Sequence, residues 1–162
     1  MRHLALRTSR RTTEVDLPAE QAWAVVASGE RGPQWYVDAA PFVVRGGLDR
    51  LLGGHGRAWD PPGTRLLATG DTAGFWRVRE AGRRGRRYRL LLDAEVRAPG
   101  RVLLRTEVEP VTGTRVRLHQ VVAFDPDGLL GLAYQLADLP AREAVLGLTH
   151  RRLLADLARH ES

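Results

Sequence analysis

Four consecutive stretches of the chain alternate apolar and charged residues with a period of two, and no other feature constrains the fold as strongly. The stretches span residues 71–80, 86–97, 101–109 and 114–124, and turns that carry glycine or proline separate them. Such alternation predicts β-strands with one face toward an apolar core and the other toward water. Strands joined by short turns pair in antiparallel order, so we expect a meander.

The two sets of alternating positions differ in polarity. Even-numbered side chains are mostly apolar and are expected to form the inner face of the sheet: Trp76, Val78, Tyr88, Leu90, Leu92, Val102, Leu104, Thr106, Val108, Val116, Leu118, Gln120 and Val122. Odd-numbered positions carry arginines interleaved with carboxylates, among them Arg87, Arg89, Glu107, Glu109, Arg115 and Arg117. This pattern predicts a solvated outer face with cross-strand ion pairs of roughly 0.2–1 kcal/mol each.

The N-terminal part of the chain precedes this sheet with one strand and two helices. A first strand is expected over residues 12–17, and Pro18 then opens a helix, a position at which proline is tolerated. Residues 29–40 are expected to form a loop, and residues 41–52 a second short helix.

A long helical pattern follows the strands, over residues 129–159, and Pro140 inside it is expected to kink the helix or split it in two. An antiparallel sheet with one apolar face needs a covering layer, and this helix is the only element long enough to supply it. The sequence therefore predicts an α+β helix-grip fold, in which a curved antiparallel sheet wraps around a long C-terminal helix. We expect residues 12–160 to form this single domain, and residues 1–11 a basic tail or an extension of the first strand.

The positive charge of the chain is weaker evidence of a partner than its value suggests. The net charge is +6, all 25 basic residues are arginine, and lysine, asparagine and isoleucine are absent, which indicates a GC-rich coding bias. A nucleic-acid platform interleaves aromatic residues with arginines, and only Phe75 does so on the outer face. Nucleic-acid binding is therefore the third of three hypotheses. No segment resembles a signal peptide or reaches the roughly 20 apolar residues of a membrane span, so we expect a cytoplasmic protein.

Gln120 stands out because it is an amide in an otherwise apolar row. A buried amide without a partner costs about 1–3 kcal/mol, so Gln120 needs either a partner within the protein or a bound molecule that it orients. Apolar walls with a few polar groups are typical of small-molecule pockets. We expect six residues to line such a pocket: Trp35, Tyr36, Trp76, Tyr88, Gln120 and Tyr134.

Two of these expectations leave alternatives open. Trp35 and Tyr36 fall in the expected loop over residues 29–40, where they either flank a pocket mouth or cap the edge of the sheet. Tyr134 lies in the first half of the C-terminal helix, which is apolar nearly all round. Such a helix is buried on more than one side, so it covers a cavity or meets a second subunit, and a homodimer stays open.

Reaction chemistry has few candidate groups. The chain has no cysteine, its three serines lie near the chain or helix ends, and its five histidines lack paired ligand spacing. We therefore expect no metal and no cofactor. If the protein is an enzyme, the candidate catalytic residues are Tyr36, Gln120 and Asp71, the last at the expected rim of the cavity.

Several strings resemble the START-like superfamily, which includes polyketide cyclases and lipid-transfer domains. The strings are RGGLDRLLGG (45–54), GDTAGFWRV (70–78), AEVRAPGRVLL (94–104) and LHQVVAFDPDGLLGLAY (118–134). The closest resemblance is to an uncharacterised bacterial branch, a domain-of-unknown-function family often fused to an NAD(P)-binding Rossmann domain. That family's pattern has an acidic residue where this chain has Gly74.

The resemblance implies a helix-grip fold that binds an apolar or amphipathic small molecule between the sheet and the C-terminal helix. The alternative it implies is a cyclase or isomerase acting on a polyketide-like metabolite. Since no Rossmann domain accompanies this chain, it is expected to act alone or beside a separate reductase or biosynthetic enzyme.

Overall fold

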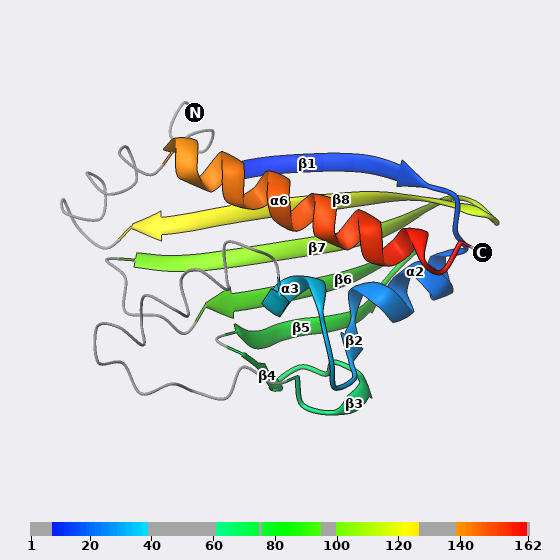
Figure 1. Ribbon diagram of the computed structural model, residues 1–162, viewed down its shortest axis with the longest axis horizontal. Helices are drawn as coiled ribbons and strands as arrows, with labels where there is room; N and C mark the ends of the chain where they lie inside the picture. Colours follow the sequence, from blue (N-terminus) through cyan, green and yellow to red (C-terminus); the bar gives the residue numbers. More distant parts are fainter. Residues whose placement is uncertain (1–7, 39–60, 75, 95–99, 127–138, 162) are drawn as a thin grey trace.

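The computed structural model describes residues 8–38, 61–74, 76–94, 100–126 and 139–161 (Figure 1). Its main layer is a six-stranded antiparallel sheet in the order β1-β8-β7-β6-β5-β4. The strands are β1 (Thr8–Val15), β4 (Thr72–Ala73), β5 (Trp76–Arg84), β6 (Arg87–Ala94), β7 (Gly100–Thr112) and β8 (Arg115–Pro126). The first strand of the chain thus pairs with the last strand of the meander.

The helices lie on one face of this sheet (Figure 1). They are α2 (Ala19–Val26), α3 (Trp35–Asp38) and α6 (Leu139–Ala158). The long α6 contacts β1 and β8, and it also packs against α2 and α3. A two-stranded sheet, β2 (Ser28–Gly29) with β3 (Thr64–Leu66), lies beside α2. An antiparallel sheet covered by a C-terminal helix is the expected helix-grip architecture, which confirms the predicted fold class.

Burial follows the predicted alternation. Leu90, Leu92, Leu104 and Leu118 are fully or almost fully buried on the inner face, together with Gln120. The helices cover this face with residues of α2 and α3 and with one stripe of α6, where a helical spacing brings three leucines to the same side. These leucines, all fully buried, are Leu146, Leu153 and Leu157.

Glycine breaks the stretch that was expected to be one strand over residues 71–80. Gly74 has a φ of 65°, in the left-handed region that favours glycine, and it lies between β4 and β5. The two strands pair as Thr72↔Arg77 and Ala73↔Trp76, so the single predicted strand is wrong. The physical reason is the tight turn between the two strands, which the left-handed conformation of Gly74 permits.

Pro140 does not interrupt the described helix. It is the second residue of α6, where its missing N–H would have no helical partner in any case, so the expected kink is absent from residues 139–158. The expected loop over residues 29–40 instead begins with the second residue of β2 and contains α3, and β3 was not predicted. The expected helix over residues 41–52 and Tyr134 lie outside the described residues.

Candidate functional site

Three aromatic residues expected at a pocket lie in the core, and each donates its polar hydrogen to a backbone carbonyl. Trp35 Nε1 donates to Val26 O at 3.0 Å, and Tyr36 Oη donates to Ser28 O at 2.6 Å. Trp76 Nε1 donates to the carbonyl of Tyr36 at 2.9 Å. All three side chains are at most 2% exposed. Trp35 and Tyr36 therefore form part of a buried helix, not a loop, because these bonds tie α3 to α2, β2 and β5.

Gln120 has partners within the protein, as one of its two interpretations required. Its Nε2 donates to Thr106 Oγ1 at 3.2 Å, across the neighbouring strand β7. Its Oε1 lies 2.8 Å from Nδ1 of His150, which α6 places against the sheet. The other ring nitrogen of His150 lies 2.8 Å from Thr13 Oγ1 on β1. Four polar side chains from four elements thus form a cluster, which we call the Gln120–His150 cluster.

The geometry of this cluster fixes which ring nitrogen of the neutral His150 carries the proton. Gln120 Oε1 can only accept, so Nδ1 donates, and Nε2 accepts from the hydroxyl of Thr13. Burial lowers the pKa of His150 below its ordinary 6.5, and the nearby Arg11 guanidinium lowers it further. His150 is 5% exposed and is therefore held as a neutral imidazole at neutral pH.

The sequence contained a pattern that predicts a buried position for His150. Leu146, His150, Leu153 and Leu157 follow one another at steps of four, three and four residues, which places them on one face of a helix. A histidine within an apolar helical stripe faces the core and needs a partner there. The expectation for the histidines rested on metal-ligand spacing alone, so this residue and Thr13 were missed.

The remaining predicted residues have different surroundings. Tyr88 is half-buried, and its ring stacks on Trp23 of α2 with centroids 5.3 Å apart and an interplanar angle of 21°. Asp71 Oδ2 accepts a hydrogen bond from the backbone N–H of Ala68 at 2.8 Å, which closes the turn before β4. Trp23, which was not among the expected residues, is also part of the core.

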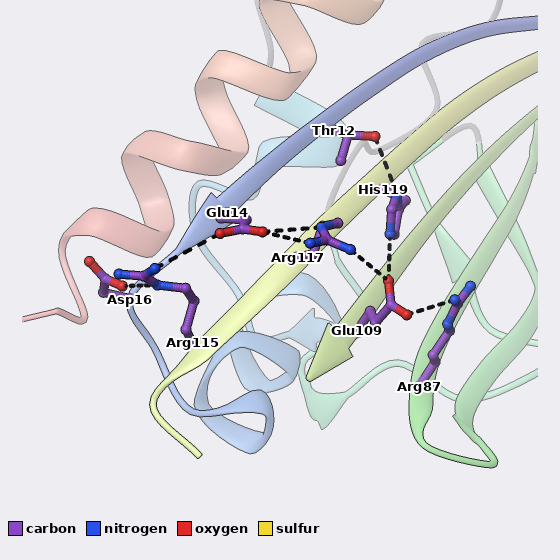
Figure 2. Close-up of polar contacts among 8 residues, drawn as sticks. All are labelled: Thr12, Glu14, Asp16, Arg87, Glu109, Arg115, Arg117 and His119. Atoms are coloured by element: carbon purple, nitrogen blue, oxygen red, sulfur yellow. Dashed lines mark hydrogen bonds and ion pairs between the residues drawn. The ribbon is translucent and has the colours of Figure 1, made fainter. Parts of the chain in front are cut away.

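The outer face of the sheet is a ladder of cross-strand ion pairs (Figure 2). Glu109 on β7 contacts the guanidinium of Arg87 at 2.7 Å and Nε2 of His119 at 2.9 Å. The hydrogen bond from His119, with a smaller effect of Arg87, lowers the pKa of Glu109. Farther along, Glu14 accepts from Arg117 at 2.7 Å. The predicted solvated face with cross-strand ion pairs is therefore present.

A separate groove of about 380 Å³ lies where the C-terminal end of α6 meets α2, β2 and β3. Its walls carry both signs of charge, including Arg65, Arg159 and Asp156. The carboxylate of Asp156 is within 3.3 Å of Arg159 and 3.4 Å of Arg152. None of the expected pocket residues that the structure describes lines this groove.

The chain matches a protein family over residues 5–148, the family described as "Protein of unknown function (DUF2867)". The chain belongs to this family. The match confirms the resemblance to a domain-of-unknown-function family stated from the sequence, and the fold agrees with the helix-grip architecture that the resemblance implied. No relative was found among curated proteins.

Solved structures that match this chain have little sequence identity to it. A hypothetical protein of Helicobacter pylori has a TM-score of 0.55 and 14% identity, over 96% of this chain and 88% of that chain. A protein of Thermus thermophilus has a TM-score of 0.40 and 11% identity, over 96% and 99% of the two chains. The Zhui aromatase/cyclase from a Streptomyces species has a TM-score of 0.36 and 13% identity, over 96% of each chain.

Two kinds of feature are absent from the described ranges. Within residues 8–38, 61–74, 76–94, 100–126 and 139–161, His, Asp and Glu side chains form no group of three that would hold a metal ion. None of the helices in these ranges combines the length and the apolar character that crossing a membrane requires.

Proposed function

We propose that this protein binds an apolar or amphipathic small molecule between the sheet and α6, with a polar group of the ligand at the Gln120–His150 cluster. The observation that carries the proposal is a set of polar side chains buried on an otherwise apolar inner face. Thr106 and Gln120 are both fully buried there, and His150 nearly so. Apolar walls with a few oriented polar groups are what a binding site for such molecules requires.

The hydrogen-bonding capacity of the cluster indicates which polar group fits. In the described part of the chain, the bonds of Gln120 use one of its two amide N–H groups, and Thr106 accepts without donating. Thr149 Oγ1 on α6 is buried and has no hydrogen-bond partner among the described residues. Each of these three groups has an unused hydrogen-bond donor, so this part of the interior favours a ligand with an acceptor oxygen, such as a carbonyl or a carboxylate.

Native mass spectrometry of the purified protein, followed by solvent extraction, tests the proposal directly. We expect a co-purified molecule of apolar or amphipathic character, and a fluorescent fatty acid should bind and be displaced by the extract. Thr106→Val removes a donor with almost no change in volume and should weaken fatty-acid binding by about tenfold, the equivalent of one hydrogen bond.

Arg117→Gln, on the outer face, is the matched control and should leave the affinity unchanged. A protein that carries no such molecule and does not bind the fatty acid would contradict the proposal. Equal fatty-acid affinities of Thr106→Val and Arg117→Gln would mean that the polar group of the ligand does not bind Thr106.

A cyclase or isomerase activity is the second candidate, and His150 is the observation that favours it. A neutral imidazole in an apolar interior is a suitable general base or acid, and its contact with Gln120 fixes its orientation. Tyr36 and Asp71 already bind backbone groups. If the protein is an enzyme, His150→Gln should abolish turnover of a polyketide-like substrate while the fatty-acid probe still binds. Turnover that survives this substitution would argue against the activity.

A further inference from the structure

One edge of the six-stranded sheet is open in the described part of the chain. β1 is the terminal strand of the sheet and pairs on one side only, with β8 (Figure 1). An open strand presents a row of backbone N–H and C=O groups that another strand can extend. A second strand can therefore pair with β1 if its side chains match those of β1.

The side chains of β1 alternate between the two faces of the sheet. Thr12 pairs with His119 and Glu14 with Arg117, so both belong to the outer face, and alternation places Arg10 there too. Arg10 is exposed, and its guanidinium has no partner among the described residues. The outer side of β1 thus presents a free cation two residues before Thr12 and a carboxylate two residues after it.

We propose that two copies of the chain pair antiparallel through β1, about a two-fold axis at Thr12. This register places Arg10 of one copy opposite Glu14 of the other, and the symmetry repeats the pair. The two sheets of six strands would then form one continuous sheet. Opposite charges on directly opposed strand positions are stabilising, and here they give the free Arg10 a partner.

Neighbouring registers fit less well. A two-fold axis at Arg11 would place that arginine opposite its own copy, and like charges in this position are destabilising. An axis at Thr13 would place Arg10 opposite Asp16, which lies beyond the end of β1, whereas Glu14 lies within the strand. Only the axis at Thr12 joins Arg10 to an acid within the strand.

The position of α6 is compatible with this pairing. The helix starts near the N-terminal end of β1 and crosses the sheet obliquely toward α2 (Figure 1). In the antiparallel pair, the end of β1 that α6 accompanies lies beside the other end of the partner's β1. The two copies of α6 therefore do not meet over the same end of the shared edge.

Cysteine cross-linking tests the register, because the natural chain contains no cysteine. Opposed residues of antiparallel strands have Cα atoms about 4.5–5.5 Å apart, within the range of a disulfide. Thr12→Cys should therefore form a disulfide-linked dimer on mild oxidation. Arg10→Cys mixed with Glu14→Cys should cross-link as a heterodimer, whereas Arg10→Cys alone should not, because its two copies would lie about 13 Å apart along the strand.

Charge exchange tests the same contact without a covalent bond. Light scattering after gel filtration should find a dimer for the unmodified protein. Arg10→Glu should raise the dimer dissociation constant by about tenfold or more, because two attractive pairs become repulsive. Arg10→Glu with Glu14→Arg should restore much of the affinity. Arg86→Glu, the same charge change at the exposed β5–β6 turn, should have no effect.

Three results would overturn the pairing. They are an unmodified protein that is monomeric at high concentration, a Thr12→Cys variant that stays monomeric on oxidation, and equal dissociation constants for Arg10→Glu and Arg86→Glu. A dimer that forms without the Thr12 cross-link would mean that the copies meet through another surface.

Discussion

Gln120 and His150 each provide the hydrogen-bond partner that the other requires in the interior. An amide and an imidazole that were buried separately would each lose hydrogen bonds to water, whereas the 2.8 Å contact between them recovers one for both. Thr13 and Thr106 complete the cluster from β1 and β7. At the scale of single residues, this cluster links α6 to three strands of the sheet, so its state of protonation affects the whole domain.

We expect the protein to lose stability on mild acidification because of His150. The folded state holds the pKa of this residue below the ordinary 6.5, so below pH 6.5 the unfolded state binds more protons. The contribution is complete above pH 6.5 and is lost as the pH falls through the lowered pKa. One proton limits the slope to about 1.4 kcal/mol per pH unit. Urea unfolding at pH 7.5, 6.5 and 5.5 measures it.

His160 provides the control for this experiment. It is exposed just beyond the end of α6, and His160→Gln leaves the Gln120–His150 cluster intact, so this variant should keep the pH dependence that the cluster causes. His150→Gln should flatten it over the same interval. If His150→Gln keeps the slope, another group is responsible for the acid sensitivity.

Glu109 contacts three side chains of the ion-pair ladder on the outer face. Its contribution to the free energy of unfolding should be largest at low salt. Its carboxylate contacts Arg87 and His119, and Arg117 lies at 3.9 Å. Because the pair is partly exposed, Glu109→Gln should cost about 1 kcal/mol or less in the free energy of unfolding. Urea unfolding at low salt and at 1 M NaCl should show the cost shrinking with salt. A cost that is independent of salt would contradict an electrostatic role.

At the scale of elements, alternation and periodicity predicted the strands and the helix but not where each of them begins and ends. Gly74 ends β4 after two residues, and Pro140 lies in the first turn of α6. Glycine and proline commonly end or interrupt secondary structure, so both residues marked possible boundaries in the sequence. Whether a proline starts a helix or interrupts it depends on where the preceding chain stops being helical, which composition does not indicate.

Proline substitutions in α6 distinguish these two roles. Pro140→Ala should change the free energy of unfolding by less than about 1 kcal/mol, since no helical hydrogen bond is missing in the first turn. Arg151→Pro, at an exposed position in the middle of the same helix, should cost about 3 kcal/mol or more. Circular dichroism with thermal melting compares the two. Equal losses would mean that α6 extends as a helix before Leu139.

At the scale of the whole molecule, the charge of +6 is distributed so that much of it is neutralised locally. Arg79, Arg87, Arg89, Arg115 and Arg117 each contact a carboxylate on the same or a neighbouring strand, or just beyond it. A nucleic-acid interface needs arginines that are available to phosphates. The outer face therefore resembles a solvated ion-pair surface more than a binding platform.

We expect no saturable binding of nucleic acid to this face. Fluorescence anisotropy with a labelled single-stranded DNA and a duplex, at about 50 mM salt, should give no more than weak, non-specific binding. Glu109→Gln, which frees arginines on the ladder, should increase such binding slightly and serves as the positive comparison. Tight binding by the unmodified protein that falls steeply with salt would restore the nucleic-acid hypothesis.

The sequence by itself determined which side chains of the sheet face inward. Val78, Leu92, Leu104 and Leu118 are buried as predicted, because a strand's period of two is a local property that each residue carries. The need of Gln120 for a partner followed from the same pattern. Only the tertiary structure decided that the partner is His150, because a helix 30 residues farther along the chain supplies it. Local rules say which face a residue occupies, and packing between distant elements says what it meets there.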